Sequence, residues 1–213
     1  MSSPNYKMDH RTNLIHPSVV IEDGVELGEN NFIGPFCYFT GHLTIGDNNR
    51  FESHCAIGTR PEHAAHWHQD GRTIIGDDNM FREHVTIHGA MTDGLTRVGN
   101  NVIMLRHSHV AHNCIVENNV TLSVSAIMLG HVHVMKYSNC GTGSEVHQFQ
   151  VIGSWAMVGM GCVVPKASRI EPHKVYVGNP ARELRDNTYY EVTPEEIHEE
   201  TVRWQKLLEN NNV

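Results

Sequence analysis

The sequence predicts an all-β fold, a parallel β-helix built from six-residue repeats, followed by a short C-terminal α-helix. Three observations predict it: an apolar residue recurs at every sixth position, the fourth residue after it is frequently small, and a Gly, Asn or acidic residue often follows it directly. One large and one small inward-facing position in each repeat describe a short strand and a turn. Three such sides close a prism, so residues 18 apart should lie above one another.

The six-residue register starts at Ile15 and restarts once, at Val98, from which it continues to Tyr176. Its apolar positions are Ile15, Ile21, Leu27, Ile33, Phe39, Ile45, Phe51, Ile57, Ile75, Phe81, Ile87, Val98, Met104, Val110, Val116, Leu122, Met128, Val134, Cys140, Val146, Ile152, Val158, Val164, Ile170 and Tyr176. An antiparallel sandwich would alternate at a period of two, and an amphipathic helix would drift from a period of six within two turns. The strict register therefore favours the β-helix.

Two segments interrupt the rhythm, residues 59–73 and residues 89–97. The first occupies a multiple of six, which predicts a loop after which the coil resumes on the same face at Ile75. The second shifts the phase. Loops that leave a rigid solenoid are where specificity is normally built, so both are candidates for the substrate site.

The repeat ends after Tyr176, and a helix is expected near the C-terminus. Thr193-Pro-Glu-Glu196 is a capping box with Pro at the first helical position. The residues that follow at helical spacing predict roughly four turns: Ile197, Thr201, Trp204 and Leu208. We expect this face to pack on the last coil or on a neighbouring subunit, where it covers an open sheet end, with a loosely docked tail as the alternative.

These patterns divide the chain into three parts. A polar N-terminal segment covers 1–14, the β-helix covers 15–181, and the helical tail covers 182–213. The five cysteines are odd in number, far apart and without a CxxC pair, so neither a disulfide framework nor a zinc ribbon is indicated. We expect them to be small buried residues.

The composition describes one acidic domain. The 213 residues carry 16 Lys and Arg against 24 Asp and Glu, a formal charge of −8, which leaves no basic footprint for nucleic acid. No stretch approaches the roughly 18 apolar residues of a membrane span, and the first residues lack the apolar core of a signal peptide. We therefore expect a cytoplasmic protein with no membrane span and no nucleic-acid partner.

Histidine is over-represented, with 17 copies, and several fall in one column. His112, His131 and His147 differ by 19 and 16, which places them on one edge of three successive coils, with His109 one turn back. Imidazoles stacked in this way are able to share a substrate, one acting as a base near neutral pH while others hold polar groups. Solvated corner histidines are the alternative interpretation.

Several segments resemble a known family, the UDP-N-acetylglucosamine O-acyltransferases of lipid A biosynthesis. The resemblance covers about 15–164 and is most specific in SHVAHNC, LGHV and VHQFQVIGSWAMVG. It implies a left-handed parallel β-helix, a homotrimer, and transfer of a 3-hydroxyacyl chain from acyl carrier protein to a nucleotide-linked sugar, with no bound cofactor.

The same resemblance implies roles for individual residues. His112 matches the family's catalytic histidine, and Gly130 in LGHV matches the glycine whose backbone N–H stabilises the thioester oxyanion. Positions that match contacts to the sugar, its diphosphate, the acyl chain or the nucleotide are His109, His131, His147, Gln148, Met160 and Asn179. Met160 stands where several members have Gly, which implies a short or medium acyl chain.

The chain also departs from the family. Asn113 follows the catalytic histidine where members commonly have Asp, and Glu62, His63 and Ala65 replace a Gln-Asp pair and a Lys that engage the nucleotide sugar. The C-terminus resembles that of the small acetyl-coenzyme A-dependent acetyltransferases of amino sugars. Two choices stay open. The acyl donor is either acyl carrier protein, through its phosphopantetheine arm, or coenzyme A, and the acylated atom is either oxygen or nitrogen.

Two alternative functions belong to different classes of protein. The γ-class carbonic anhydrases share this β-helix and bind zinc with three histidines between subunits, a pattern onto which His88, His107 and His112 could be superposed. The LGHV and VHQF segments have no role in that scheme. A catalytically silent trimeric scaffold is the remaining alternative.

Overall fold

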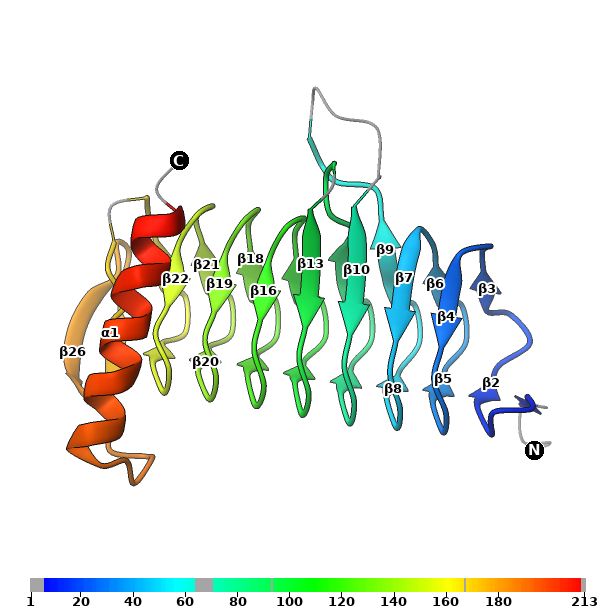
Figure 1. Cartoon of the computed structure of the whole chain (residues 1–213), viewed down its shortest axis with the longest axis horizontal. Helices are drawn as coiled ribbons and strands as arrows, with labels where there is room; N and C mark the ends of the chain where they lie inside the picture. Colours follow the sequence, from blue (N-terminus) through cyan, green and yellow to red (C-terminus); the bar gives the residue numbers. More distant parts are fainter. Residues whose placement is uncertain (1–5, 64–70, 93, 167, 212–213) are drawn as a thin grey trace.

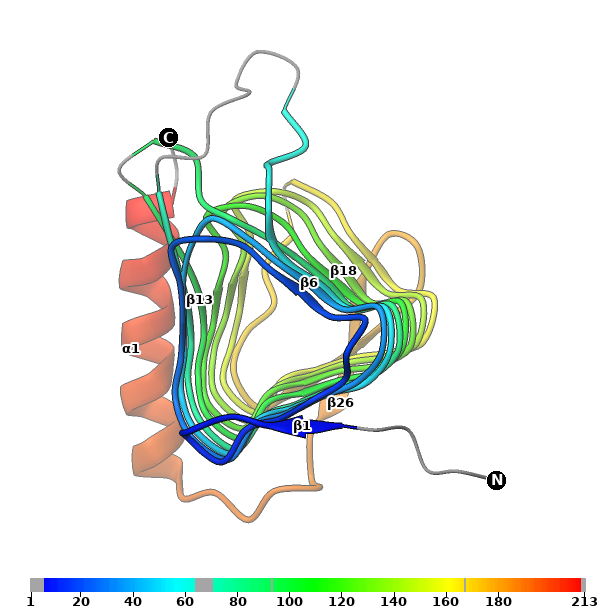
Figure 2. The same ribbon diagram turned by 90° about the vertical axis from the view of Figure 1, so that its right-hand side faces the viewer.

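The computed structural model describes residues 6–63, 71–92, 94–166 and 168–211, and the chain winds through three parallel sheets that form a triangular prism (Figures 1 and 2). In Figure 2 the N-terminal coil faces the viewer, and the chain turns counterclockwise as it recedes. The predicted left-handed parallel β-helix is therefore confirmed.

Each sheet takes one short strand from every coil, apart from a strand added at each end of the largest sheet. The eleven-stranded sheet contains β1 (Lys7–Met8), β2 (Leu14–Ile15), β5 (Phe32–Ile33), β8 (Arg50–Phe51), β11 (Met80–Phe81), β14 (Ile103–Met104), β17 (Thr121–Leu122), β20 (Asn139–Cys140), β23 (Met157–Val158), β25 (Lys174–Val177) and β26 (Arg182–Asp186). The eight-stranded sheet contains β3 (Val20–Ile21), β6 (Tyr38–Phe39), β9 (Ala56–Thr59), β12 (Thr86–His88), β15 (His109–Val110), β18 (Ile127–Met128), β21 (Glu145–Val146) and β24 (Val163–Val164). The seven-stranded sheet contains β4 (Val25–Leu27), β7 (His42–Ile45), β10 (Arg72–Ile75), β13 (Leu95–Val98), β16 (Ile115–Val116), β19 (His133–Val134) and β22 (Val151–Ile152).

The register residues fill the inside of the prism, as predicted. From Ile33 onward they are buried, while Ile15, Ile21 and Leu27 are partly exposed because no further coil covers the first one. The small residues four places later are also buried, and all five cysteines are free and buried as expected. A continuous apolar core therefore runs along the prism axis.

A ladder of buried asparagine side chains joins the early coils. Asn13, Asn31, Asn49 and Asn79 lie above one another, and the Oδ1 of each accepts a hydrogen bond from the backbone N–H one coil later. In the last of these hydrogen bonds, the Val102 N–H donates to Asn79 Oδ1 at 2.7 Å. These amides satisfy corner backbone groups that would otherwise be buried without partners.

Both interruptions of the repeat are insertions at one corner. Ile75 pairs with Ile45 on the seven-stranded sheet, whereas Ile57 lies on the eight-stranded sheet. The prediction that the coil resumes on the same face after residues 59–73 was therefore wrong: the chain moves to the next face. Figure 1 shows this insertion, partly in grey, beside the shorter one formed by 89–97.

The C-terminal segment closes the eleven-stranded sheet and then covers another face. β26 pairs antiparallel with β25 at the sheet edge, and α1 (Pro194–Asn211) follows. The predicted capping box is confirmed, since Thr193 N–H and Oγ1 both bond to Glu196 Oε2. The helix has 18 residues and is one turn longer than predicted. Within the described residues, no helix combines the length and apolarity needed to cross a bilayer.

The helix packs on the outer face of the seven-stranded sheet, not over the open end of the prism (Figure 2). Trp204 and Leu208 pack against Met135 and Val151, and the Trp204 indole N–H donates to the Val151 carbonyl. Ile197 and Thr201, predicted to belong to the buried face, are only partly buried. The end of the eleven-stranded sheet is instead covered by β26.

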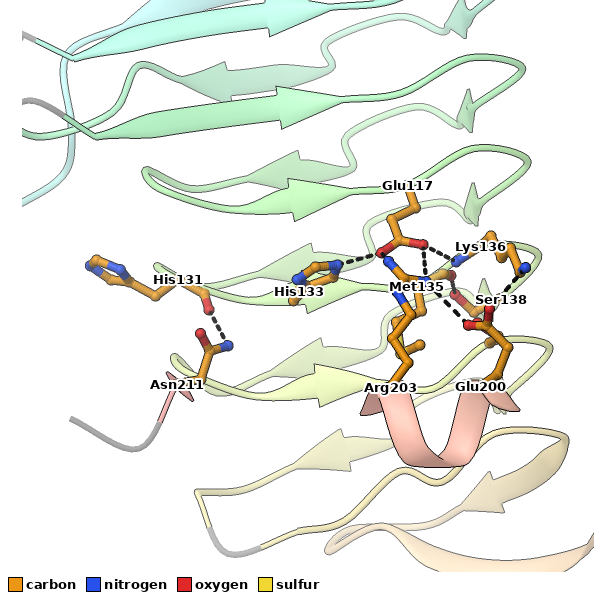
Figure 3. A network of polar contacts seen from close by, with 10 residues as sticks. Glu117, His131, His133, Met135, Lys136, Ser138, Glu200, Arg203 and Asn211 are labelled. Atoms are coloured by element: carbon orange, nitrogen blue, oxygen red, sulfur yellow. Dashed lines mark hydrogen bonds and ion pairs between the residues drawn. The ribbon is translucent and has the colours of Figure 1, made fainter. Parts of the chain in front are cut away.

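A charged network fixes the helix to the sheet (Figure 3). The Glu117 carboxylate bonds to His133 Nε2 at 2.6 Å and to the Arg203 guanidinium of α1. Glu200 of α1 pairs with Lys136 at 2.9 Å and with Arg203. Burial raises the pKa of Glu117, but the bonds from His133 and Arg203 outweigh it and lower that pKa to about 2.

Glu117→Gln should loosen this docking. We expect the free energy of unfolding at pH 7 to fall by about 2 kcal/mol, the scale of hydrogen bonds to a charged group. Because the folded pKa lies below the usual 4.5, the carboxylate's contribution is complete above pH 4.5 and is lost as the pH falls towards 2. Urea unfolding followed by tryptophan fluorescence at pH 7 and pH 3 would measure both effects, with the exposed Glu209→Gln as control. Equal stabilities of the two variants would contradict this role of Glu117.

Candidate active site

The candidate active site lies at the corner where the eight-stranded sheet passes into the seven-stranded sheet, which we call the site corner. In three successive coils it comprises residues 111–114, 129–132 and 147–150. Both insertions leave the prism at this same corner, between β9 and β10 and between β12 and β13. The described ends of both insertions therefore lie at the site corner.

The His112 imidazole is held in one orientation by its neighbour in sequence. Its Nδ1 lies 3.0 Å from Asn113 Oδ1. The same oxygen accepts the Met91 N–H at 3.0 Å, which fixes the amide with its oxygen towards the ring. Nδ1 is therefore the protonated nitrogen that donates, and Nε2 keeps a lone pair that is able to accept a proton.

The environment keeps His112 neutral. Only 8% of the residue is exposed. Burial lowers the pKa of His112, the hydrogen bond with Asn113 partly opposes this, and the nearby His63 lowers it further. A neutral imidazole at physiological pH is the form that a general base requires.

Gly130 lies one coil beyond His112, directly against its ring. A Cβ at this glycine would stand 2.6 Å from His112 Cε1 and 2.8 Å from Nε2. The missing side chain is therefore what lets the imidazole lie on the next coil. The Gly130 carbonyl accepts the Phe149 N–H, and no hydrogen bond found among the described residues uses the Gly130 N–H. That N–H is available to a reacting oxygen beside the base.

Two further histidines line the wall formed by β12 and β15. His109 Nδ1 lies 2.7 Å from Thr86 Oγ1, and its ring meets His88 edge to face at 4.6 Å. Burial, followed by the charges of His109 and His112, lowers the pKa of His88 to about 4. Burial also lowers the pKa of His109, although the Glu62 carboxylate and the Thr86 bond oppose it. The wall therefore presents neutral imidazoles at pH 7.

The predicted histidine column is brought together only in part. One coil is 18 residues long, so the residues directly above His112 on the next two coils are Gly130 and Gln148. His131 and His147 stand one position to either side of them. His131 still meets the His112 ring edge to face at 5.3 Å. His147 lies one position before Gln148, and its Nδ1 donates to the Gln148 carbonyl at 3.0 Å.

An open cavity of about 570 Å³ lies over His112, Gly130 and the wall formed by β12 and β15. The described part of the 59–73 loop contributes Glu62 and His63 to its wall, and Ala65 lies outside the described residues. The cavity is lined by Glu62, His63, Thr86, His88, His109, Ala111, His112, Ile127, Leu129, Gly130 and Gln148. Polar groups gather around His112, while Ile127 and Leu129 supply an apolar side suited to an alkyl chain.

Four predicted substrate residues do not line this cavity in the protomer: His131 and His147, which lie at the site corner, and Met160 and Asn179, which lie at other corners. Met160 stands at the corner between the eleven- and eight-stranded sheets, with 77% of its surface exposed. Asn179 is exposed in the turn between β25 and β26. Neither Met160 nor Asn179 therefore contacts this cavity within the protomer.

The alternative zinc set is also separated. His107 is exposed at the same corner as Met160 and stacks on His84 at 4.9 Å, whereas His88 and His112 face the cavity. Within the described ranges, no group of three or more His, Cys, Asp or Glu side chains is placed to hold a metal ion. The zinc hypothesis therefore has no ligand cluster in the described protomer.

Sequence reasoning missed the contacts that orient the site. Thr86 lies 23 residues before His109 and Met91 lies 22 before Asn113, because an insertion lengthens that coil. The phase shift at 89–97 was the available signal, since it predicts an altered coil directly before the one that carries His112.

Comparison with known proteins identifies a matching family, curated relatives and solved structures of similar fold. Residues 24–59 match the family described as bacterial transferase hexapeptide (six repeats). An acyl-[acyl-carrier-protein]–UDP-N-acetylglucosamine O-acyltransferase of Nautilia profundicola is 36% identical over 141 residues, which are 65% of this chain and 54% of that protein. The enzyme of the same name from Campylobacter concisus is 31% identical over 226 aligned positions, covering 93% of this chain and 84% of that protein.

Solved structures agree with these relatives. The UDP-N-acetylglucosamine acyltransferase of Campylobacter jejuni superposes with a TM-score of 0.75 and 26% identity, over 92% of this chain and 87% of that one. The corresponding protein of Francisella novicida gives a TM-score of 0.72 and 28% identity, over 90% of this chain and 79% of that one. With a relative above 30% identity aligned over most of both chains, this chain belongs to the acyl-[acyl-carrier-protein]–UDP-N-acetylglucosamine O-acyltransferase family.

Proposed function

We propose that this acyltransferase moves an acyl group from an acyl-carrier-protein thioester to a hydroxyl of UDP-N-acetylglucosamine, with Nε2 of His112 as the general base. The observation that carries the proposal is the placement of the His112 imidazole, whose Nδ1 is engaged by Asn113 and whose Nε2 side lies against Gly130. The names of the relatives from Nautilia and Campylobacter supply the substrates.

The chemistry follows from this geometry. The sugar oxygen attacks the thioester carbonyl carbon and forms the new C–O bond, while Nε2 takes the hydroxyl proton. The negative charge that develops on the carbonyl oxygen is stabilised by the Gly130 N–H. When the C–S bond breaks, the imidazolium returns the proton to the departing thiolate, so the enzyme ends in its starting state and no metal or redox cofactor is needed.

The homotrimer and its clefts belong to the same proposal. The seven-stranded sheet is partly covered by α1, whereas the other two sheets present apolar side chains to the outside. Val20 is 54% exposed on the eight-stranded sheet, and Met80 and Ile103 are 38% and 40% exposed on the eleven-stranded sheet. Contact between these faces of neighbouring copies would bury them and enclose the open cavity at the site corner. Cytoplasmic location stays a prediction from the sequence.

Thiol release by the purified protein tests the function. UDP-N-acetylglucosamine and its amino-sugar relatives would be offered against a series of acyl-carrier-protein and acyl-coenzyme A donors of increasing chain length. We expect acceptor-dependent release with an acyl-carrier-protein donor and the hydroxyl acceptor. Release only with coenzyme A donors and amino sugars would overturn the substrate assignment, and silence with stoichiometric zinc in the preparation would overturn the reaction.

Met160→Gly tests the predicted length limit. Removing the exposed Met160 side chain should open space at its corner and lengthen the preferred acyl chain, since each methylene that becomes buried contributes about 0.8 kcal/mol. Competition among acyl-carrier-protein donors of different length, read by mass spectrometry of the products, would measure the shift. The exposed Met8→Gly is a suitable control, and an unchanged product profile for Met160→Gly would discredit the assignment.

A further inference from the structure

Asn113 connects the active-site histidine to the shorter insertion. Its Oδ1 faces His112 Nδ1 and the Met91 N–H, both at 3.0 Å, and its own backbone N–H donates to Thr96 Oγ1 at 2.8 Å. The residue takes a left-handed conformation, with φ of 59°, which Asn tolerates better than most residues. One side chain therefore contacts the base and the 89–97 loop simultaneously.

The loop is shaped around this amide. A Cβ at Gly94 would stand 2.1 Å from Asn113 Nδ2, a distance that real side chains do not show. Gly94 is thus a glycine because the Asn113 amide occupies the space where a side chain would lie. Met91, Gly94 and Thr96 contact Asn113 from three points of the same insertion, two of them through its amide.

We propose that Asn113 is a positioning residue through which the 89–97 loop holds His112 with Nδ1 protonated and Nε2 free. This inference rests on the proposed function, because the orientation matters only if Nε2 accepts a proton. The amide oxygen accepts a hydrogen bond but takes up no proton and adds no charge, so the loop selects the tautomer while the imidazole stays neutral.

A carboxylate at the same position would act differently. In Asn113→Asp both acceptor contacts remain possible, but a negative charge faces the ring and favours the imidazolium. The base must then lose its proton at a higher pH, so the acid limb of the kcat/KM profile should move up by about one pH unit. The other titratable groups that face His112 are unchanged in this variant: His63 of the 59–73 loop, His88 of β12, His109 of β15 and His131 of the next coil.

Four variants test the inference. Asn113→Ala removes the oxygen that accepts the hydrogen bond from His112 Nδ1. Gly94→Ala adds a methyl group that displaces the Asn113 amide but touches neither His112 nor the cavity. For both variants we expect kcat to fall at least about tenfold with KM nearly unchanged. Asn113→Asp should keep activity at high pH and show the shifted acid limb. Thr96→Val is the matched control, because it removes only the backbone contact and should cost stability without moving the pH profile.

The outcomes separate this inference from the function on which it rests. Loss of activity in His112→Ala, together with a wild-type kcat and pH profile in Asn113→Ala, would overturn the positioning role alone. Activity retained in His112→Ala would remove the proposed mechanism itself. Thermal unfolding of each variant identifies any that fail to fold, and Asn113→Asp, which adds no volume, keeps the test available if Gly94→Ala does not fold.

Discussion

His112→Ala is expected to lower kcat by about three orders of magnitude while leaving the fold unchanged. The estimate is the usual contribution of a positioned general base, between about 10² and 10⁴. The imidazole also fills space against Gly130, so some loss of stability is expected from the vacated volume. Acceptor-dependent thiol release, measured from pH 5 to pH 9, gives the rate and the shape of the profile.

The pH profile adds a second criterion to this experiment. Burial holds the pKa of His112 below its ordinary value of 6.5, so the wild-type enzyme should keep its activity to a pH below 6.5 and lose it only as Nε2 becomes protonated. The residual activity of His112→Ala should lack this acid limb. His42→Ala, at an exposed strand position of β7, is the matched control. A variant that retains a tenth of the activity with the same acid limb would exclude His112 as the base.

Gly130→Ala should be the second most damaging substitution. The added methyl group would stand 2.6 Å from His112 Cε1, so the imidazole must leave its position beside the Gly130 N–H. Because the base and the oxyanion donor are then separated, we expect kcat to fall by about 10² to 10³, the range seen when an oxyanion donor is lost.

Gly34→Ala provides the control for this experiment. A Cβ at Gly34 would meet the backbone of the next coil at 3.0 Å, far from the site, so this variant should lose stability without losing specific activity. Comparison of kcat with the denaturation midpoint for both variants separates damage to the site from damage to the prism. Equal specific activities in the two variants would show that Gly130 has no special relation to His112.

The sequence was sufficient for the architecture because the repeat reports packing directly. Each large register residue must point into the prism, so periodicity alone identified the core from Ile33 to Tyr176. The same periodicity fails at the first insertion. A period of six tells which residues point inward but not on which of the three sheets they lie. It therefore does not decide whether Ile75 lies on the same sheet as Ile57 or on the next one. Hydrogen-bond pairing with Ile45 decides this, and pairing is a property of the folded chain.

The site was predictable where it depends on motif and on the 18-residue coil. His112 and Gly130 were identified by their match to the family's motifs, and the structure places them in contact. The histidine column was less well described, because one position of difference along a corner changes the direction in which a side chain points. The phase shift at 89–97 marks an altered coil but does not specify the contact of Met91 with Asn113, since that contact depends on how an irregular insertion folds back.

Both insertions enter at one corner, and this arrangement separates changes beside the candidate site from the pairing that holds the rest of the scaffold. Strand β10 pairs with β7 after 30 residues in place of the usual 18, yet β10 keeps a regular four-residue register with both β7 and β13, and the one irregularity beside the insertions lies in the β9–β12 pair at His88. A coil contacts only the coils next to it, so a corner loop is free to lengthen, shorten or change sequence without cost to distant pairs. Variation in the two loops therefore changes the surroundings of His112, while the pairing of distant coils stays as it is.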